Sequence, residues 1–436
     1  MRLFAVVPVL SLFSCSLAGV TIQRAGVSVP ESMTNIAPGI MLFLTTTWLP
    51  SAWVTSTFAC VRDDNSVYRW TRGIIWAQWF RFKYPILLEE AKEVADKLIF
   101  AWLGDNDIPY GFLNFTTNEA QTNIAEAGSL TLEWSTLNKY TQNTTYEKLA
   151  TEAVMHIANL PAPLPGLATQ IIDPTTGDFV GDTWGSGNDL YSEYLVKYAR
   201  LSNTNDPIYI DTWKTAVDSS IHTLLKVNTR TTHTSPIATD GNILHVGSYL
   251  TCFYAGNWFY GGKSVRNENI VNYGLALNDG CWNTYASTLT GIGPESFAFS
   301  EDGNYIGGAA PTADQLEFYD EYGFYIPDSI YVLRPEVLES KFYAWRGDTK
   351  YPDRAASAID SFNKYLAVPS GDFAGLKDVT VGAPGGYWDV MESFWFAEVL
   401  KYLYLTFDDP NHISLDEYVY NTECLPFKAP PALDSH

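Results

Sequence analysis

The stretch YPDRAASAIDSFNKYL, residues 351–366, carries the pattern that decides the fold. Its apolar residues return every three or four positions, which predicts an amphipathic helix with one buried face. The stretch opens with a Tyr followed seven positions later by an Ala, and the same Tyr-x6-Ala pattern begins at Tyr84, Tyr146 and Tyr209. The first three copies are about 63 residues apart, and the fourth follows a little over two such intervals later, which indicates one helical hairpin per unit.

Further helical segments are predicted between these copies, at residues 130–140, 190–201 and 392–407. Strand-like alternation is confined to short pieces near residues 171–180 and 325–333. The connections are long, as at residues 159–189 and 228–267, whereas open solenoids have shorter repeats and fewer long loops. We therefore predict an all-α toroid of helical hairpins, with long loops at one end, where functional sites are commonly built.

The composition narrows the class of protein. The 436 residues include 49 acidic and 27 basic side chains, for a net charge of -22. A strongly acidic chain repels phosphate backbones and anionic lipid surfaces, which argues against nucleic acid or a membrane surface as partner. Hydrophobic residues make up 46% of the chain and aromatic residues 15%, so there is enough apolar surface for a large core.

The N-terminus is typical of a secretory signal peptide. Arg2 is followed by an apolar run at residues 3–13 and by the small-residue site Ser16-Leu17-Ala18. We therefore predict a signal peptide at residues 1–18, cleavage near Ala18, and a secreted protein without membrane association. Two sequons predict N-glycosylation on that route, at Asn114 and Asn143.

Four cysteines remain outside the signal, namely Cys60, Cys252, Cys281 and Cys424. Four cysteines allow three full pairings, and the sequence alone does not choose among them. We favour Cys252 with Cys281, because an oxidising compartment permits a bridge and a loop of that size would contribute roughly 3 kcal/mol.

Carboxylates embedded in aromatic, apolar sequence are the candidates for chemistry. No nucleophile elbow, HExxH motif or dinucleotide-binding glycine motif occurs, and the histidines lack metal-ligand spacing. The embedded carboxylates are Glu126, Glu133, Asp189, Glu193, Glu336, Glu339, Glu392 and Glu398. Any one of them could be a solvated or salt-bridged helix position, but four such segments near helix starts favour a shared acidic pocket. Acidic and aromatic linings suit sugars.

These segments together resemble glycoside hydrolase family 47, the class I α-1,2-mannosidases, and look most like its secreted fungal branch. The matching segments are IPYGFLN (108–114), NIAEAGSLTLEW (123–134), GSGNDLYSEYLVKYARL (185–201), LRPEVLES (333–340), MESFWFAEVLKYLYLTFDDP (391–410) and LDEYVYNTE (415–423). The resemblance implies an (α/α)7 barrel, here at residues 83–430. It also implies inverting, calcium-dependent removal of α-1,2-linked mannose from high-mannose N-glycans or mannooligosaccharides, and we expect a monomer.

The resemblance also implies roles for single residues. Asp189 corresponds to one catalytic carboxylate and Glu336 to another, the usual candidate for the base. Thr422 matches the residue whose hydroxyl and carbonyl bind the calcium, and Cys252 with Cys281 matches the family's disulfide. The positions that correspond to sugar and water binding are Glu126, Arg334, Glu339, Glu392 and Glu423.

The resemblance is weakest at the N-terminal end. The family's general acid lies in a Phe-Glu-Thr-x-Ile-Arg motif shortly before the helix that here begins near Tyr84. Residues 65–80 instead read NSVYRWTRGIIWAQWF and hold no carboxylate. Early family signatures are also missing, so residues 19–82 form an atypical N-terminal region. At about 63 residues per hairpin the mature chain holds slightly fewer than seven units, which leaves open whether the barrel closes.

Three single positions depart as well. Tyr249 stands where the family has a sugar-contacting His, Leu190 replaces a Ser, and Leu425 replaces a His.

These departures leave two functions to be weighed. One is an active α-1,2-mannosidase; the other is a catalytically impaired paralogue that binds mannose glycans, because loss of a general acid typically costs about 10² to 10⁴-fold in rate. A third interpretation is that residues 19–82 do not represent the natural coding sequence, which transcript sequencing would test.

Overall fold

A computed structural model describes residues 85–103, 105–114, 120–181, 184–185, 188–227, 232–234, 243–299, 310–345 and 348–433. Before residue 69 it also describes four short strands, β1 (Gln23–Arg24), β2 (Val27–Ser28), β3 (Cys60–Val61) and β4 (Ser66–Tyr68). The predicted signal peptide at residues 1–18 and almost all of the atypical region at residues 19–82 lie outside the described residues, so the predictions made for them stay predictions.

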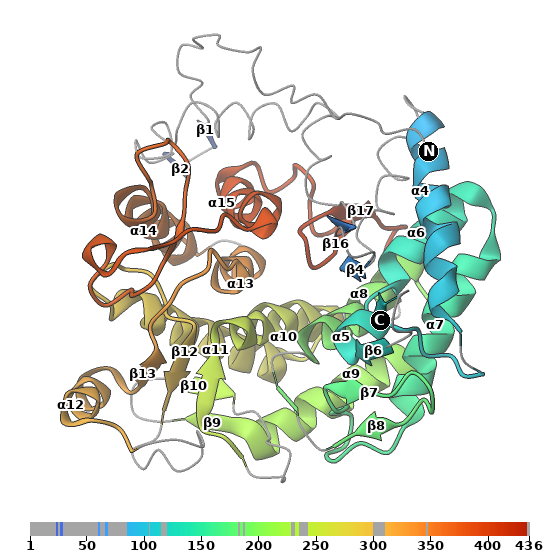
Figure 1. The fold of residues 1–436 in the computed structure, drawn as a ribbon, viewed down its shortest axis with the longest axis horizontal. Helices are drawn as coiled ribbons and strands as arrows, with labels where there is room; N and C mark the ends of the chain where they lie inside the picture. The colour runs from blue at the N-terminus through green and yellow to red at the C-terminus, as the bar shows by residue number, and fades with distance from the viewer. Residues whose placement is uncertain are drawn as a thin grey trace.

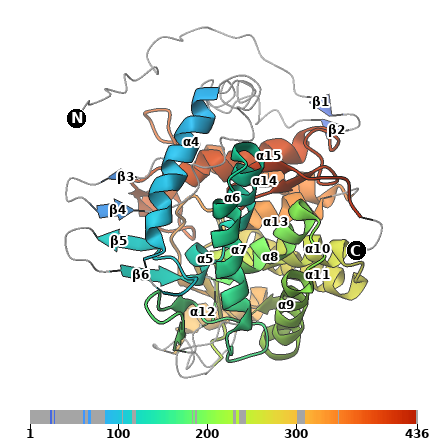
Figure 2. The same ribbon diagram turned by 90° about the vertical axis from the view of Figure 1, so that its right-hand side faces the viewer.

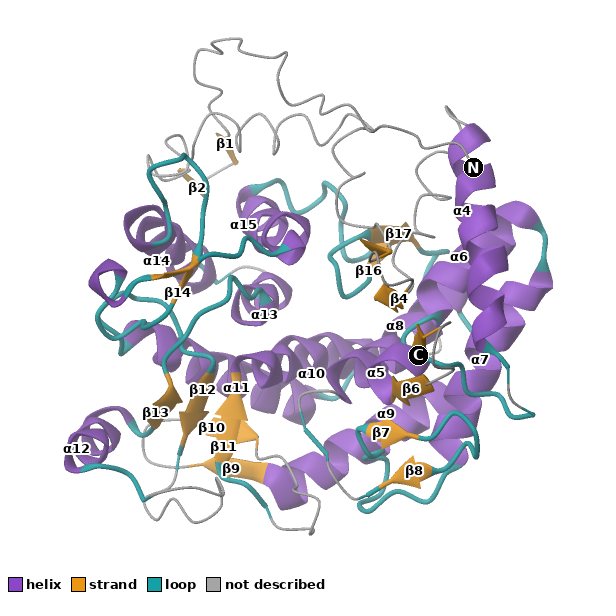
Figure 3. Cartoon of the chain, viewed as in Figure 1, coloured by secondary structure: helices purple, strands orange, loops and turns teal. Residues whose placement is uncertain are grey.

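Helices dominate the described chain and most of the long ones pack in pairs (Figures 1 and 3). One series of helices, called the inner helices, consists of the first helices of four pairs and the last helix of the chain: α6 (Thr131–Thr141), α8 (Asp189–Ser202), α10 (Phe253–Ser264), α13 (Glu336–Ala344) and α15 (Leu400–Phe407). Each inner helix contacts the next one in this series. The second helices, which pack on α6, α8, α10 and α13, are α7 (Thr144–Asn159), α9 (Pro207–Ser219), α11 (Glu268–Ala286) and α14 (Lys350–Tyr365). This arrangement confirms the predicted α/α architecture.

Helix α4 (Pro85–Leu98) and several shorter helical segments complete the described helices. Helix α4 packs on α6 and lies beside it in Figure 2. The remaining segments are η4 (Ile99–Ala101), α5 (Ile124–Ala127), η6 (Ser220–Leu224), η7 (Tyr249–Cys252), α12 (Ala313–Tyr322), η9 (Ala383–Gly385) and η10 (Trp395–Val399).

The Tyr-x6-Ala pattern marks the buried faces of the second helices. Tyr146 and Ala153 of α7, Tyr209 and Ala216 of α9, and Tyr351 and Ala358 of α14 are all buried. Ala91 of α4 is buried too, whereas Tyr84 lies outside the described residues. Positions seven apart lie on one face of a helix, so each Tyr and Ala pack inward together.

Polar caps start several of these helices where the sequence turns from loop to helix. Asn143 caps α7 by accepting from the Thr145 amide, and Asp206 caps α9 ahead of Pro207. Thr312 and Gln315 form a capping box on α12. Such caps satisfy amides that have no intrahelical partner. The sequon residue Asn143 is therefore a cap; the side chain of the other, Asn114, is not described.

Strands are short but more numerous than the sequence predicts. The six-stranded sheet runs β3-β4-β5-β6-β7-β8, and β3 to β6 lie along one edge in Figure 2. Its last four strands are β5 (Phe112–Asn114), β6 (Ala120–Asn123), β7 (Ile171–Ile172) and β8 (Phe179–Val180). The others are β9 (Leu225–Val227), β10 (Thr232–Thr234), β11 (Val246–Ser248), β12 (Ser296–Ala298), β13 (Tyr325–Asp328), β14 (Gly375–Leu376), β15 (Tyr387–Trp388), β16 (Tyr418–Tyr420) and β17 (Pro426–Lys428).

Residues 228–267 were expected to form a long connection, and this expectation is wrong in part. The segment contains β10, β11, η7 and the whole of α10. Helix α10 reads FYAGNWFYGGKS and is buried along most of its length. A helix that is covered on nearly all sides has no exposed polar stripe, so it lacks the periodicity that reveals amphipathic helices.

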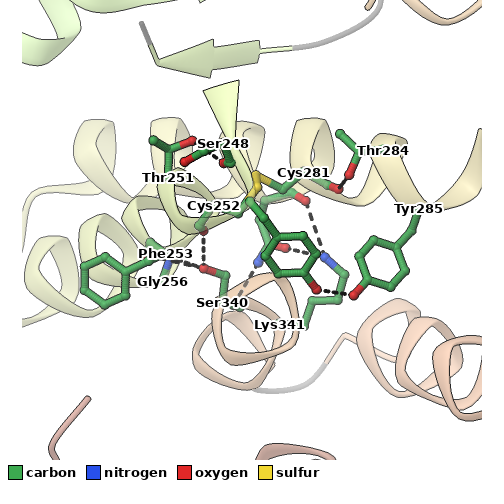
Figure 4. The surroundings of a disulfide bond; sticks show 12 residues. Ser248, Thr251, Cys252, Phe253, Gly256, Cys281, Thr284, Tyr285, Ser340 and Lys341 are labelled. Atoms are coloured by element: carbon green, nitrogen blue, oxygen red, sulfur yellow. Dashed lines mark hydrogen bonds between the residues drawn. A yellow bond between two sulfur atoms is a disulfide. The ribbon is translucent and has the colours of Figure 1, made fainter. Parts of the chain in front are cut away.

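The predicted disulfide is confirmed. Cys252, at the end of η7, is bonded to Cys281 of α11, and Ser340 of α13 lies beside the bridge (Figure 4). Cys424 is buried with a free thiol. Among the described residues, no helix is long and apolar enough to cross a membrane.

Candidate active site

Two carboxylates occupy the first position of inner helices. Asp189 begins α8 and is 9% exposed, and Glu336 begins α13 and is half-buried. The positive end of the helix dipole favours a negative charge at both positions. Asp189 and Glu336 are called the first-turn pair.

Glu336 is held in an environment that favours its protonated form. One carboxylate oxygen, Oε2, is buried and has no hydrogen-bond partner among the described residues. Burial raises the pKa of Glu336 to about 7, against the lowering effect of Arg334, and Glu295 adds a smaller increase. A carboxylate with this proton affinity and a free oxygen suits a general base.

Arg334 is clamped two residues before Glu336. Its Nε and one Nη donate to the two carboxylate oxygens of Glu295, each at 2.7 Å. Planar bidentate pairs of this kind fix orientation as well as charge. The sequence predicts Arg334 as a site residue but gives no indication of Glu295, which lies 39 positions away.

Glu193 and Glu339, called the second-turn pair, lie deeper on the same two helices. Glu193 is hydrogen-bonded to Lys197, which also donates to the Tyr343 hydroxyl at 2.8 Å. Glu339 accepts from the Tyr402 hydroxyl at 2.8 Å. Burial raises the pKa of Glu339 well above its usual range, and the nearby Glu193 charge raises it further. Burial of a charge is costly, so these partners are required for stability.

These contacts fix the relative direction of α8 and α13. Glu193 interacts with Glu339, and Lys197, four positions on, contacts Tyr343, also four positions on. Equal steps along both helices mean that they run in the same direction and in register. Asp189 and Glu336, about one turn earlier, therefore lie at the same end of the barrel.

The hairpin β16–β17 inserts its turn among the inner helices. Asn421 donates to Glu133 of α6 at 2.8 Å, and Tyr194 of α8 donates to the same oxygen at 2.6 Å. Lys401 of α15 donates to the carbonyls of Glu423 and Cys424, each at 3.1 Å. The turn is thus held by residues of α6 and α15, and Figure 1 shows β16 and β17 between these two helices.

Thr422 lies in this turn between two buried residues. Asn421 and Glu423 are buried and Thr422 is half-buried. No hydrogen bond of the described residues uses the hydroxyl or carbonyl oxygen of Thr422, so both are available as hard oxygen ligands. The described residues contain no group of three or more His, Cys, Asp or Glu side chains arranged to hold a metal. Water would have to supply most ligands of a cation bound here.

Glu126 lies on α5, and this helix packs on α8, the helix that begins with Asp189. Its amide is capped by Asn123, and its Oε2 lies directly over Gly111. A Cβ on residue 111 would lie 1.9 Å from that oxygen, so any larger residue there would displace the Glu126 carboxylate.

Glu392 and Glu398 differ in burial and in the groups that they contact. The carboxylate of Glu392 takes part in no described hydrogen bond or ion pair, and the side chain is half-buried. Glu398 is 7% exposed and interacts electrostatically with Lys401 and Cys424. The structure therefore brings Glu398, an embedded carboxylate for which the resemblance implies no role, to the hairpin turn.

The carboxylates, tyrosines and clamped arginine at one end of an α/α barrel define a carbohydrate-active class of protein. Residues 58–429 match the family model described as glycosyl hydrolase family 47. The chain belongs to this family and is a glycosidase.

Named relatives agree with this assignment. A probable mannosyl-oligosaccharide alpha-1,2-mannosidase 1B of Aspergillus clavatus is 38% identical over 370 residues, which cover 79% of this chain and 71% of the relative. A mannosyl-oligosaccharide alpha-1,2-mannosidase 1B of Aspergillus phoenicis is 36% identical, with coverage of 79% and 70%. The alpha-1,2-mannosidase structure from Trichoderma reesei superposes with a TM-score of 0.77 at 28% identity, covering 90% of this chain and 86% of that one. A D-mannose isomerase, at 12% identity and a TM-score of 0.57, shares the fold alone.

Proposed function

We propose that this glycosidase is an inverting, calcium-dependent α-1,2-mannosidase that trims terminal mannose from high-mannose N-glycans or related oligosaccharides. The substrate class is supported by the names of the relatives. The observation that carries the mechanism is the buried, partner-free Oε2 of Glu336 at the start of α13.

Glu336 is the base in this proposal. Its half-buried carboxylate takes a proton from a water molecule, whose oxygen attacks the anomeric carbon of the sugar. The bond from that carbon to the leaving oxygen breaks, and the leaving oxygen receives a proton from an acid. Arg334, held by Glu295, keeps a positive charge near Glu336 and lowers its pKa against burial. Asp189 supplies the second carboxylate at the same end.

Thr422 is the residue proposed to hold calcium, through its hydroxyl and carbonyl oxygens. When bound, the ion would orient sugar hydroxyls and water in the pocket. Glu339 and Glu423 belong to the surrounding acidic layer, which suits a divalent cation. We also propose that residues 1–18 direct the protein to the secretory pathway and that it acts there or after secretion.

A catalytically impaired mannose-glycan binder is the second candidate. The observation that favours it is the absence of any carboxylate between Asn65 and Phe82, where the resemblance places the general acid. The carboxylates of the first-turn and second-turn pairs would remain in such a protein.

Purified protein incubated with α-1,2-linked mannobiose separates the two candidates. Release of free mannose that a calcium chelator abolishes and added calcium restores is the result expected of the enzyme. Binding of mannobiose without release, measured by calorimetry on the same sample, would overturn the mannosidase and support the binder.

A further inference from the structure

Three buried tyrosines lie behind the segment that carries Arg334 and Glu336. They are Tyr249 of η7, Tyr285 of α11 and Tyr331, and none is more than 1% exposed. Their rings pack closely, with centroids 6.0 Å apart for Tyr249 and Tyr285 and 5.7 Å apart for Tyr249 and Tyr331. Full burial excludes direct contact with a bound sugar, so any role in the reaction is exerted through other residues.

The three hydroxyls form one network. The hydroxyls of Tyr249 and Tyr285 are hydrogen-bonded, and so are those of Tyr285 and Tyr331. Burial raises the pKa of each hydroxyl, so all three stay neutral donors. A buried hydroxyl that loses its partner is costly, which makes the geometry of such a network rigid.

Tyr331 connects this network to the catalytic segment. Its hydroxyl donates to the backbone carbonyl of Arg334 at 3.1 Å, and its own backbone pairs with Leu376 through two hydrogen bonds of 2.9 Å. Between these anchors, Leu333 has a φ of +64°. A non-glycine residue persists in this strained region only where the surroundings hold it there.

The disulfide ties the network to the body of the barrel. Tyr249 lies three residues before Cys252, and Tyr285 lies four residues after Cys281, so the bridge joins the two elements that carry them. Ser340 of α13 donates to the Cys252 carbonyl at 2.6 Å and accepts from the Gly256 amide at 2.8 Å (Figure 4). The helix that begins with Glu336 is thus docked on the same assembly.

We infer that Tyr249, Tyr285 and Tyr331 are positioning residues, whose hydroxyl network holds residues 333–336 and thereby places the Glu336 carboxylate for the reaction. This inference rests on the proposed function, in which Glu336 is the base. The network acts through the Arg334 carbonyl and the start of α13, and it touches neither substrate nor calcium.

The test uses Tyr331→Phe and Tyr285→Phe in the full chain. The control is Tyr198→Phe, which removes a hydroxyl that donates to Glu147 at 2.9 Å on another face of the barrel. For each variant, kcat and KM are measured on α-1,2-mannobiose with calcium, and amide hydrogen exchange is followed at residues 333–339. Because small displacements of a reacting group can cost about 10²-fold, we expect kcat to fall 10-fold or more while KM changes less than about 2-fold. Exchange should quicken at residues 333–339 in both variants and remain unchanged there in the control.

The outcomes separate this inference from the proposed function. A wild-type protein that releases mannose, with variants that match it in kcat and in exchange, would overturn the positioning role alone. A wild-type protein that releases no mannose would overturn the proposed mannosidase. In that case the exchange result still decides whether the tyrosines hold the segment: faster exchange confined to residues 333–339 supports the positioning role, and unchanged exchange overturns it.

Discussion

The first-turn pair and the second-turn pair place carboxylates on the same two helices, α8 and α13, but differ in burial and in the groups that contact them. Glu193 and Glu339 have a lysine and tyrosines as partners, deep in the barrel. Glu336 keeps one oxygen without a described partner, at the end where the helices begin. Burial raises the pKa of both Glu339 and Glu336, but Glu339 is 2% exposed whereas Glu336 is half-buried, so Glu336 is the one that can exchange a proton with a ligand. Carboxylates one helical turn apart thus differ in role: the second-turn pair stabilises the fold, and Glu336 is available to react.

The largest effect is expected from Glu336→Gln. The amide keeps the shape of the side chain but cannot take a proton from water, so kcat on mannobiose should fall about 10² to 10⁴-fold. Glu317→Gln, on α12, is the control and should retain wild-type kcat. An active Glu336→Gln variant would show that the first-turn pair is not the reactive pair.

The next effect is expected from Lys197→Met in the second-turn pair. The change leaves Glu193 buried without its cation, which should lower the free energy of unfolding by about 3 to 5 kcal/mol in urea denaturation. Lys148→Met breaks an exposed pair with Glu152 at 3.6 Å and should change stability by less than about 1 kcal/mol. Equal losses in the two variants would remove the distinction between buried and exposed pairs.

The pH dependence of stability gives a third test of the comparison. Because the pKa of Glu336 is raised to about 7 in the fold, the native state retains a proton that the unfolded chain has already lost. This contribution is fully present below about pH 4.5 and is lost as the pH rises towards 7. In metal-free protein, Glu336→Gln should therefore gain stability relative to wild type as the pH rises from 5 to 8, by up to about 3 kcal/mol. A pH-independent difference in thermal denaturation would contradict the raised pKa.

The smallest effect is expected from Gly111→Ala. The new Cβ would displace Glu126 Oε2, the end of a flexible side chain, so the loss of stability should be at the low end of the overpacking range, about 1 kcal/mol. Because Glu126 is a predicted sugar-binding residue, KM for mannobiose should rise more than kcat falls. Gly371→Ala is the control: a Cβ there would meet nothing within 4 Å, but the φ of +91° makes the alanine strained, so stability should fall without a change in KM. An unchanged KM in Gly111→Ala would argue against a role for Glu126 in binding.

The sequence predicts the helices that bury only one face. The second helices bury one stripe, so Tyr146, Tyr209 and Tyr351 reveal them, whereas α10 is buried on most sides and shows no stripe. The same limit applies to the site. Asp189 and Glu336 are recognisable from their local motifs, but Asn421 meets Glu133 across 288 residues, a distance over which local patterns carry no signal.

The stereochemistry of hydrolysis tests the central claim most directly. With the methyl glycoside of α-1,2-mannobiose as substrate, whose second product keeps a blocked reducing end, proton NMR distinguishes the two anomers of the released mannose before they interconvert. If Glu336 activates a water molecule for direct attack, β-mannose must appear first and α-mannose only later, by mutarotation. Initial release of α-mannose would contradict the account, because it would require a covalent intermediate on a carboxylate instead of a base-activated water.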